Sequence, residues 1–223
     1  MSDALAKQLY LSRFARVKIQ FHYPKALDNK IKNSEISLFI NSLSPTSLSK
    51  AVVLTMKIWQ KTHIKHRLTG TGSPDLLDLP MTAFFASRQC PGTAIRAAMD
   101  WALQQARAKA VVVSGFHSPL EQSVLKVLIQ ARSQVVVVLA RPVEGVKLPP
   151  DWAEPLAQGH MAAVSATTDA TRLTEDASMA RNMVVAQLAS HIAVAHASPG
   201  GALEDLCAKW RANGRDVIDL SRI

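Results

Sequence analysis

Cysteine, long apolar runs and aromatic residues are all scarce in this chain of 223 residues. Its two cysteines, Cys90 and Cys207, are far apart and lack the spacing of metal ligands, which indicates a reduced, cytoplasmic protein. No stretch approaches the roughly 18 consecutive apolar residues that a membrane-spanning helix needs. Residues 1–18 carry charges where a signal peptide would be apolar, so secretion is not expected.

The excess of positive charge is confined to the first third of the chain. Residues 1–70 contain 12 Lys and Arg against 3 Asp and Glu, a net of +9, whereas residues 71–223 contain 14 of each. A local basic field attracts polyanions, of which nucleic acid is the usual one. A solvated helical face is the alternative. Because aromatic residues make up only 5% of the chain, binding of nucleic acid should depend on phosphate contacts more than on stacking.

The first 80 residues predict a basic helical segment followed by a linker. Apolar residues recur near helical spacing within 46–67, at Leu48, Val52, Met56 and Trp59. The stretch LTGTGSPDLLDLP has the glycines, serine and prolines that are typical of a linker. We therefore divide the chain into a basic, mostly helical N-terminal segment (1–70), a linker (71–80) and a second domain (81–223).

From residue 81 onward, apolar stretches alternate with amphipathic patterns. Six stretches predict strands: 81–87, 110–114, 134–140, 161–165, 191–197 and 216–220. Helical periodicity occupies four segments between them: 93–108, 119–132, 177–189 and 202–213. Strands that are apolar throughout are typical of sheets covered on both faces. The alternation predicts an α/β fold, a Rossmann-like, doubly wound and mainly parallel sheet with right-handed crossovers.

Three of these strands are followed by loops that combine serine, glycine and proline before a helix. The loops read SRQCPG (87–92), SGFHSP (114–119) and SPGG (198–201). Parallel strands all end at one edge of the sheet, where ligands of such folds bind. Loops of this composition can simply turn the chain. Three that converge on one edge favour binding of an anion or a nucleotide, through backbone amides at helix N-termini and glycines that permit close approach.

Several side chains at these loops have readable roles. Ser118 and Glu121 fit a capping box, which is a structural role. Arg88 and the pair Arg181-Asn182 could hold a phosphate through paired hydrogen bonds, and either arginine could equally form a surface salt bridge. His117 could donate to a phosphate or serve in acid–base chemistry, and we favour a structural or binding role over catalysis.

The sequence predicts neither a metal site nor a cofactor. His63 and His66 lie three residues apart on the expected helix without a carboxylate or cysteine nearby. Cys90 lies near a helix N-terminus, a position that can lower the pKa of a thiol, but no histidine adjoins it in sequence. A Gly-Lys-Ser/Thr phosphate loop is missing, so ATP hydrolysis of that kind is not supported.

Together these residues resemble the Rossmann-like domain of the DprA/Smf DNA-processing proteins. The resemblance covers residues 81–220 and rests on ASRQCPG (86–92), VVVSGFHSPLE (111–121), ARNMVVAQLASHIAVAHASPGG (180–201) and GRDVIDL (214–220). It implies a non-enzymatic protein of DNA processing and recombination that binds single-stranded DNA at the sheet edge. It further implies a homodimer that helps to load a recombinase.

The candidate ligand-binding residues follow from the loops and from this resemblance. By position, Arg88, Ser114-Gly115 and Arg181-Asn182 match the motifs of the family. Phe116 to Glu121 replace the second half of the family's loop, so Phe116 and His117 are where this chain's own specificity should lie. The candidate contacts to ligand or phosphate are Ser87, Arg88, Ser114, Gly115, Phe116, His117, Ser118, Arg181, Asn182, Ser198, Gly200 and Gly201.

A second resemblance, to the lysine-decarboxylase-like nucleotide phosphoribohydrolases, supports an alternative function. Their motif is Pro-Gly-Gly-x-Gly-Thr followed by two glutamates, and SPGGALEDL (198–206) begins in the same way but lacks the Gly-Thr. The alternative is a nucleotide-binding sensor, or an enzyme that releases the base from nucleoside monophosphates. Glu204 is then the weak candidate for a catalytic carboxylate.

Overall fold

The computed structural model describes residues 57–144, 146–167 and 175–222. The chain divides between Ala51 and Val52 into two compact units, and every described residue lies in the second. The predictions for residues 1–56 therefore fall outside the described part. No described helix is both long enough and apolar enough to cross a bilayer.

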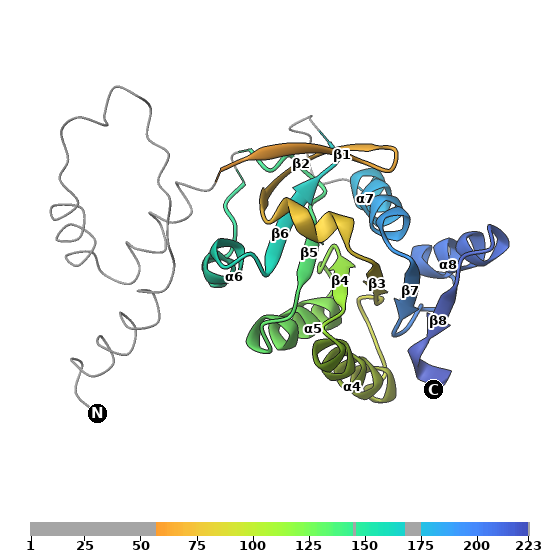
Figure 1. The fold of residues 1–223 in the computed structure, drawn as a ribbon. Coiled ribbons are helices and arrows are strands. Elements are labelled where there is room, and N and C mark those ends of the chain that lie inside the picture. Colours follow the sequence, from red (N-terminus) through yellow and green to blue (C-terminus); the bar gives the residue numbers. More distant parts are fainter. Residues whose placement is uncertain (1–56, 145, 168–174, 223) are drawn as a thin grey trace, which may run out of the picture. The chain divides into compact units, whose positions relative to one another are not determined.

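A single eight-stranded sheet organises the described residues (Figure 1). The strands are β1 (Trp59–His63), β2 (His66–Gly72), β3 (Met81–Phe85), β4 (Val111–Ser114), β5 (Val135–Val138), β6 (Met161–Ser165), β7 (His191–Val194) and β8 (Val217–Asp219). Their order across the sheet is β1-β2-β6-β5-β4-β3-β7-β8. The six strands from β3 to β8 all run parallel to one another, and β2 pairs with β6 in the antiparallel direction. The mainly parallel Rossmann-like sheet predicted from the sequence is confirmed.

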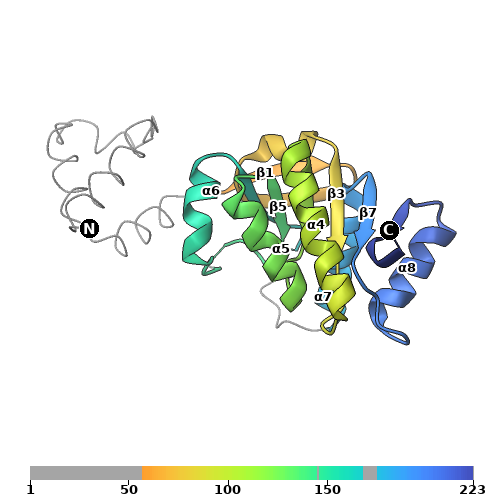
Figure 2. The same cartoon turned by 90° about the horizontal axis from the view of Figure 1, so that it is seen from below.

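Helices cover both faces of this sheet, as a doubly wound fold requires. They are α4 (Gly92–Ala108), α5 (Pro119–Gln130), α6 (Ala153–Ala157), α7 (Glu175–Leu188) and α8 (Ala202–Ala212), with short 3-10 turns at Pro74–Asp78, Pro150–Trp152 and Leu220–Arg222. Figure 2 shows α4, α5 and α6 side by side over one face. Buried side chains of α7 and α8 belong to the core on the other face. The reversal of strand order lies between β3 and β7, which are direct neighbours.

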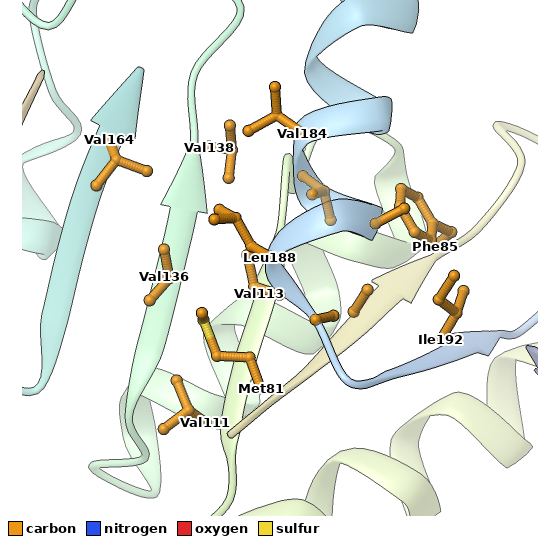
Figure 3. Close-up of a cluster of buried hydrophobic side chains, with 14 of the residues drawn as sticks. Met81, Phe85, Val111, Val113, Val136, Val138, Val164, Val184, Leu188 and Ile192 are labelled. Atoms are coloured by element: carbon orange, nitrogen blue, oxygen red, sulfur yellow. The ribbon is translucent and has the colours of Figure 1, made fainter. Parts of the chain in front are cut away.

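Two hydrophobic cores hold these layers together. Figure 3 shows one of them, in which Val136 and Val138 of β5 lie near Val184 and Leu188 of α7. Adjacent phenylalanines at the end of β3 serve opposite faces. Phe84 stacks on Trp101 of α4 with ring centroids 4.9 Å apart, and Phe85 lies 4.8 Å from Trp210 of α8. This alternation packs the end of β3 against helices on both faces of the sheet and thereby positions the loop that follows it.

The helix expected over 46–67 is wrong for residues 59–67, because these residues form a β-hairpin. In β1, half-buried and exposed residues alternate, which is the period of a strand and not of a helix. The ring of Trp59 lies where a Cβ at Gly70 would be, 2.4 Å away, and its indole Nε1–H donates to the Gly72 carbonyl at 2.9 Å. Spacing alone misled the prediction, because it took no account of Gly70, which makes room for Trp59 across the hairpin and disfavours a helix.

The linker expected at 71–80 is also wrong as a separator of domains. Thr71 and Gly72 end β2, and Leu76 and Leu77 of the following 3-10 turn are buried in the core. The Ser73 amide donates to the Met161 carbonyl at 3.1 Å, which ties this stretch to β6. Glycine, serine and proline suit a linker and equally suit a strand end and a tight turn, so composition could not separate the two.

Candidate functional site

Three loops meet where β4, β3 and β7 end side by side. We call them loop A (86–91, after β3), loop B (115–118, after β4) and loop C (195–201, after β7). In loop A, the Ser87 amide donates to the His196 carbonyl at 2.9 Å, and the Ser87 hydroxyl accepts from the Ser198 amide at 2.9 Å. Loops A and C are therefore joined at the point where the strand order reverses, the usual position of a ligand crevice in such sheets.

Glu121 joins loop A to loop B from beneath. One carboxylate oxygen accepts from the Ala86 amide at 3.1 Å, and the other accepts from the His117 and Ser118 amides at 2.7 and 3.1 Å. The Ser118 hydroxyl accepts from the Glu121 amide at 3.3 Å, so the capping box expected from the sequence is confirmed. Glu121 is only 7% exposed. Burial raises the pKa of its carboxyl group, while the three amide bonds and the charge of Arg181 act in the opposite direction.

Most of the backbone amides that the sequence offered to a phosphate already have partners within the protein. Besides the amides held by Glu121, the Phe116 amide donates to the Ser114 hydroxyl at 3.2 Å. In loop C, the Gly200 amide donates to a carboxylate oxygen of Glu204 at 2.7 Å. Two side-chain carboxylates thus occupy positions that a bound anion would take at helix N-termini. At the starts of α5 and α8, these backbone amides are therefore occupied by carboxylates of the protein itself.

Three candidate side chains of loop B and its strand are internal. Ser114 is completely buried, Ser118 is buried in the capping box, and Phe116 is 5% exposed within the core under α4 and α5. Phe116 has a φ of 46°, a left-handed conformation that turns its side chain inward at some cost in strain. The expectation that Phe116 contacts a ligand is therefore corrected: its side chain anchors the loop.

Arg88, His117 and Arg181 form a cationic cluster above the loops. Burial lowers the pKa of His117, and the charges of Arg181 and then Arg88 lower it further, which places both arginines within electrostatic reach of His117. Arg88 and His117 are exposed, while Arg181 is half-buried. The three residues come from loop A, loop B and α7, so the tertiary fold brings together what the chain separates.

Gly115 and Asn182 position Arg181. A Cβ at Gly115 would lie 2.6 Å from the Arg181 guanidinium, so only glycine leaves room for the arginine to lie across loop B. The Nε–H of Arg181 donates to the Asn182 Oδ1 at 3.0 Å. Burial lowers the pKa of Arg181 from its ordinary value, and the charge of Glu121 opposes this. The pair thus acts as one arginine held in a fixed orientation, as bidentate binding of an anion requires.

Loop C contributes mainly structure. Gly201 is the N-cap of α8, and its amide donates to the Ser198 carbonyl at 3.0 Å, while Gly200 has a φ of 69°. Glu204, the weak catalytic candidate, faces back onto loop C through its bond from Gly200. The Ser198 amide is held by the Ser87 hydroxyl of loop A, next to Arg88 in the chain.

Cys90 does not have the lowered pKa that its place near a helix N-terminus suggested. Burial raises the pKa of its thiol, and the negative charge of Glu121 raises it further. The thiol Sγ donates to the Ser87 carbonyl at 3.2 Å. Within the described residues, no three His, Cys, Asp or Glu side chains gather into a possible metal site.

The sequence reasoning missed a cleft of about 530 Å³ beside the cationic cluster. Its floor comes from the residues that end β5 and β6, among them Val138, Leu139 and Ala166, and its wall comes from α7. On α7 the lining residues are Asp176, Ala177, Ala180, Arg181 and Val184. Ala177 and Ala180, three residues apart on the expected helix, were the available signal, but alanine is too common in helices to make it specific.

Comparisons with known proteins agree with this architecture. Residues 56–218 match the sequence family described as DNA recombination-mediator protein A. DNA processing protein A from Helicobacter pylori, described for its mode of binding single-stranded DNA, has a TM-score of 0.59 at 14% identity, over 73% of this chain and 80% of that one. DNA processing protein A from Streptococcus pneumoniae has a TM-score of 0.58 at 18% identity, over 95% of this chain and 80% of that one. Among curated protein sequences, none matches the chain.

Proposed function

Because the chain belongs to the DNA recombination-mediator protein A family, we propose that it binds single-stranded DNA at loops A and B without altering the DNA chemically. The observation that carries this proposal is that the Arg181 guanidinium lies against Gly115 of loop B, while Arg181 and the loop A residue Arg88 both lie within electrostatic reach of His117. Positive groups set on a rigid edge suit the regularly spaced phosphates of a strand. The likeness to the Helicobacter pylori protein, which binds single-stranded DNA, is further support.

The side chains have separate roles in this proposal. Arg88 and Arg181 contact phosphates, with Asn182 orienting Arg181 and Gly115 making room for it. His117 adds a contact whose charge depends on pH. Ser87, Ser198 and Glu121 hold the loops in register and stay out of contact with DNA. Single strands fit better than a duplex, because the cluster lies against loops and offers no helix or ribbon to enter a groove.

Salt-dependent binding tests this proposal. Fluorescence anisotropy of a labelled oligothymidylate should give an affinity that falls steeply with salt, with a slope near −0.7 for each phosphate contact. Arg88→Ala should weaken binding and reduce that slope by about 0.7. The matched control is Arg107→Ala, at the opposite end of α4 from loop A. Failure to bind single strands, or equal behaviour of the two variants, would overturn the proposal.

The remaining parts of the proposal concern assembly. We propose that the protein acts in the cytoplasm as a homodimer and passes the bound strand to a recombinase. Sedimentation velocity of the full chain, with and without oligonucleotide, tests the dimer, and a monomer under both conditions would refute it. Release of base from nucleoside monophosphates would instead support the alternative, a nucleotide hydrolase that uses Glu204.

A further inference from the structure

The cleft and the cationic cluster share one residue, Arg181. Its guanidinium lies across Gly115 of loop B, and the same side chain lines the cleft. A ligand with a phosphate on the cationic cluster would therefore have its next chemical group at the mouth of the cleft. In single-stranded DNA that group is a sugar carrying an unstacked base.

The walls of the cleft suit a flat apolar ring. Seven of its ten lining residues are alanine, valine or leucine, and the volume lies within the range of small-molecule sites. Ala177 and Ala180 keep the α7 wall shallow, so that a ring could lie between the helix and the strand ends. Proteins that read single bases place them between apolar surfaces in this way and recognise them by their Watson–Crick edges.

Asp176 gives the cleft a chemical preference. It lies five residues before Arg181 on the same helix, about 7.5 Å along the axis. A carboxylate only accepts hydrogen bonds and repels phosphate, so its place in the lining points to a partner with N–H donors. Guanine is the base whose Watson–Crick edge carries two adjacent donors, N1–H and N2–H, which match the two oxygens of a carboxylate. Adenine and cytosine pair one donor with an acceptor, and thymine has one donor between two carbonyls.

We propose that this cleft binds one guanine base, with Asp176 accepting hydrogen bonds from N1–H and N2–H while Arg181 holds the neighbouring phosphate. The proposal rests on the function proposed above and adds a base preference to it. The guanine belongs to a DNA strand or to a free guanine nucleotide, and both present the same edge and the same phosphate.

The test compares strands that differ at one base. Anisotropy would measure binding of an oligothymidylate, of the same strand with one central guanine, and of that strand with inosine, which lacks the N2 amino group. One bidentate pair should make the guanine strand bind at least about fivefold more tightly than the thymine strand, with inosine between them. Asp176→Asn should abolish this preference and leave binding of oligothymidylate intact or slightly stronger. Asp100→Asn, at an exposed position of α4, is the matched control.

A second variant probes the cleft without altering charge. Ala180→Leu should fill the cleft and remove the guanine preference, whereas Ala208→Leu, at an exposed position of α8, should not. Competition by free GMP against free AMP separates the two sources of guanine. Selective displacement by GMP, lost in Asp176→Asn, identifies the free nucleotide as a ligand as well.

The outcomes separate this inference from the proposed function. Equal affinity for the thymine and guanine strands, or a preference that persists in Asp176→Asn, overturns the guanine site while the strand-binding function stands. If the unaltered protein binds no single-stranded DNA, the strand-binding function proposed above is overturned. The guanine site would then survive only if GMP binds selectively and Asp176→Asn abolishes that binding, and it falls if GMP does not bind.

Discussion

Replacing Glu121 by glutamine should destabilise the folded protein although the two side chains have the same shape. The carboxylate accepts from three amides with two oxygens, one toward Ala86 and one toward His117 and Ser118. Glutamine has one oxygen, so its NH₂ group must face at least one amide N–H. If the oxygen takes the side of His117 and Ser118, the Ala86 amide is left buried without an acceptor.

The magnitude follows from these bonds. A buried donor without a partner costs about 1–3 kcal/mol, and repulsion between the two facing N–H groups adds to this. Glutamine is uncharged, so the cost of burying a charge, which raises the pKa of Glu121, disappears and offsets part of the loss. We therefore expect the free energy of unfolding to fall by about 1–3 kcal/mol at neutral pH.

Urea unfolding, followed by tryptophan fluorescence, measures this change. Trp101 and Trp210 lie against Phe84 and Phe85 in the two cores, so their emission reports on the packing of the sheet. The control is Glu204→Gln, which alters a similar carboxylate bonded to the Gly200 amide at an exposed helix start, and should cost about 0.5 kcal/mol. If Glu121→Gln were no less stable than this control, the reasoning that Glu121 holds loops A and B together would be refuted.

Three further changes have expected outcomes. Gly115→Ala should reduce affinity for oligothymidylate about fivefold or more, because the new methyl group displaces the Arg181 guanidinium. The free energy of unfolding in urea should change by less than about 1 kcal/mol, because a side chain and not the backbone must move. Affinity for oligothymidylate should rise as pH falls below the usual histidine pKa of about 6.5, because the free His117 has a lowered pKa that bound phosphate would raise, so binding takes up a proton. His117→Gln should flatten this dependence in anisotropy titrations, and an unchanged slope would contradict it. Ser87→Ala should lower the free energy of unfolding by about 1 kcal/mol in urea titrations, since the Ser198 amide loses its acceptor.

The core of the fold was accessible from sequence because its signals are local. Strands such as Val135–Val138 are continuously apolar, and the start of a helix such as Pro119–Gln130 is marked by a proline and a capping box. The hairpin of β1 and β2 was not accessible in this way. The sequence pattern is explained only by the contact in which Trp59 covers Gly70 on the neighbouring strand, and these two residues are eleven positions apart in the chain.

The site was only partly accessible for a related reason. That three loops share one edge follows from parallel topology, and Arg88, His117 and Arg181 could be named as candidates. The sequence could not show which backbone amides have hydrogen-bond acceptors within the protein. Whether an amide faces a ligand or a carboxylate such as Glu121 depends on side-chain directions set by packing. The same holds for Phe116, whose left-handed backbone turns an apparent surface residue into the core.

From residue 81 onward, the sequence by itself determined the order of the parallel strands, the longer helices between them and the edge at which the loops gather, because hydrophobic periodicity and helix caps act over a few residues. Tertiary structure decided which groups face outward at that edge. In the folded protein, amides of loop B donate to Glu121, Arg181 lies over Gly115, and a cleft forms between α7 and the ends of β5 and β6. These outcomes depend on contacts between residues distant in the chain, and so they arise only when the layers pack.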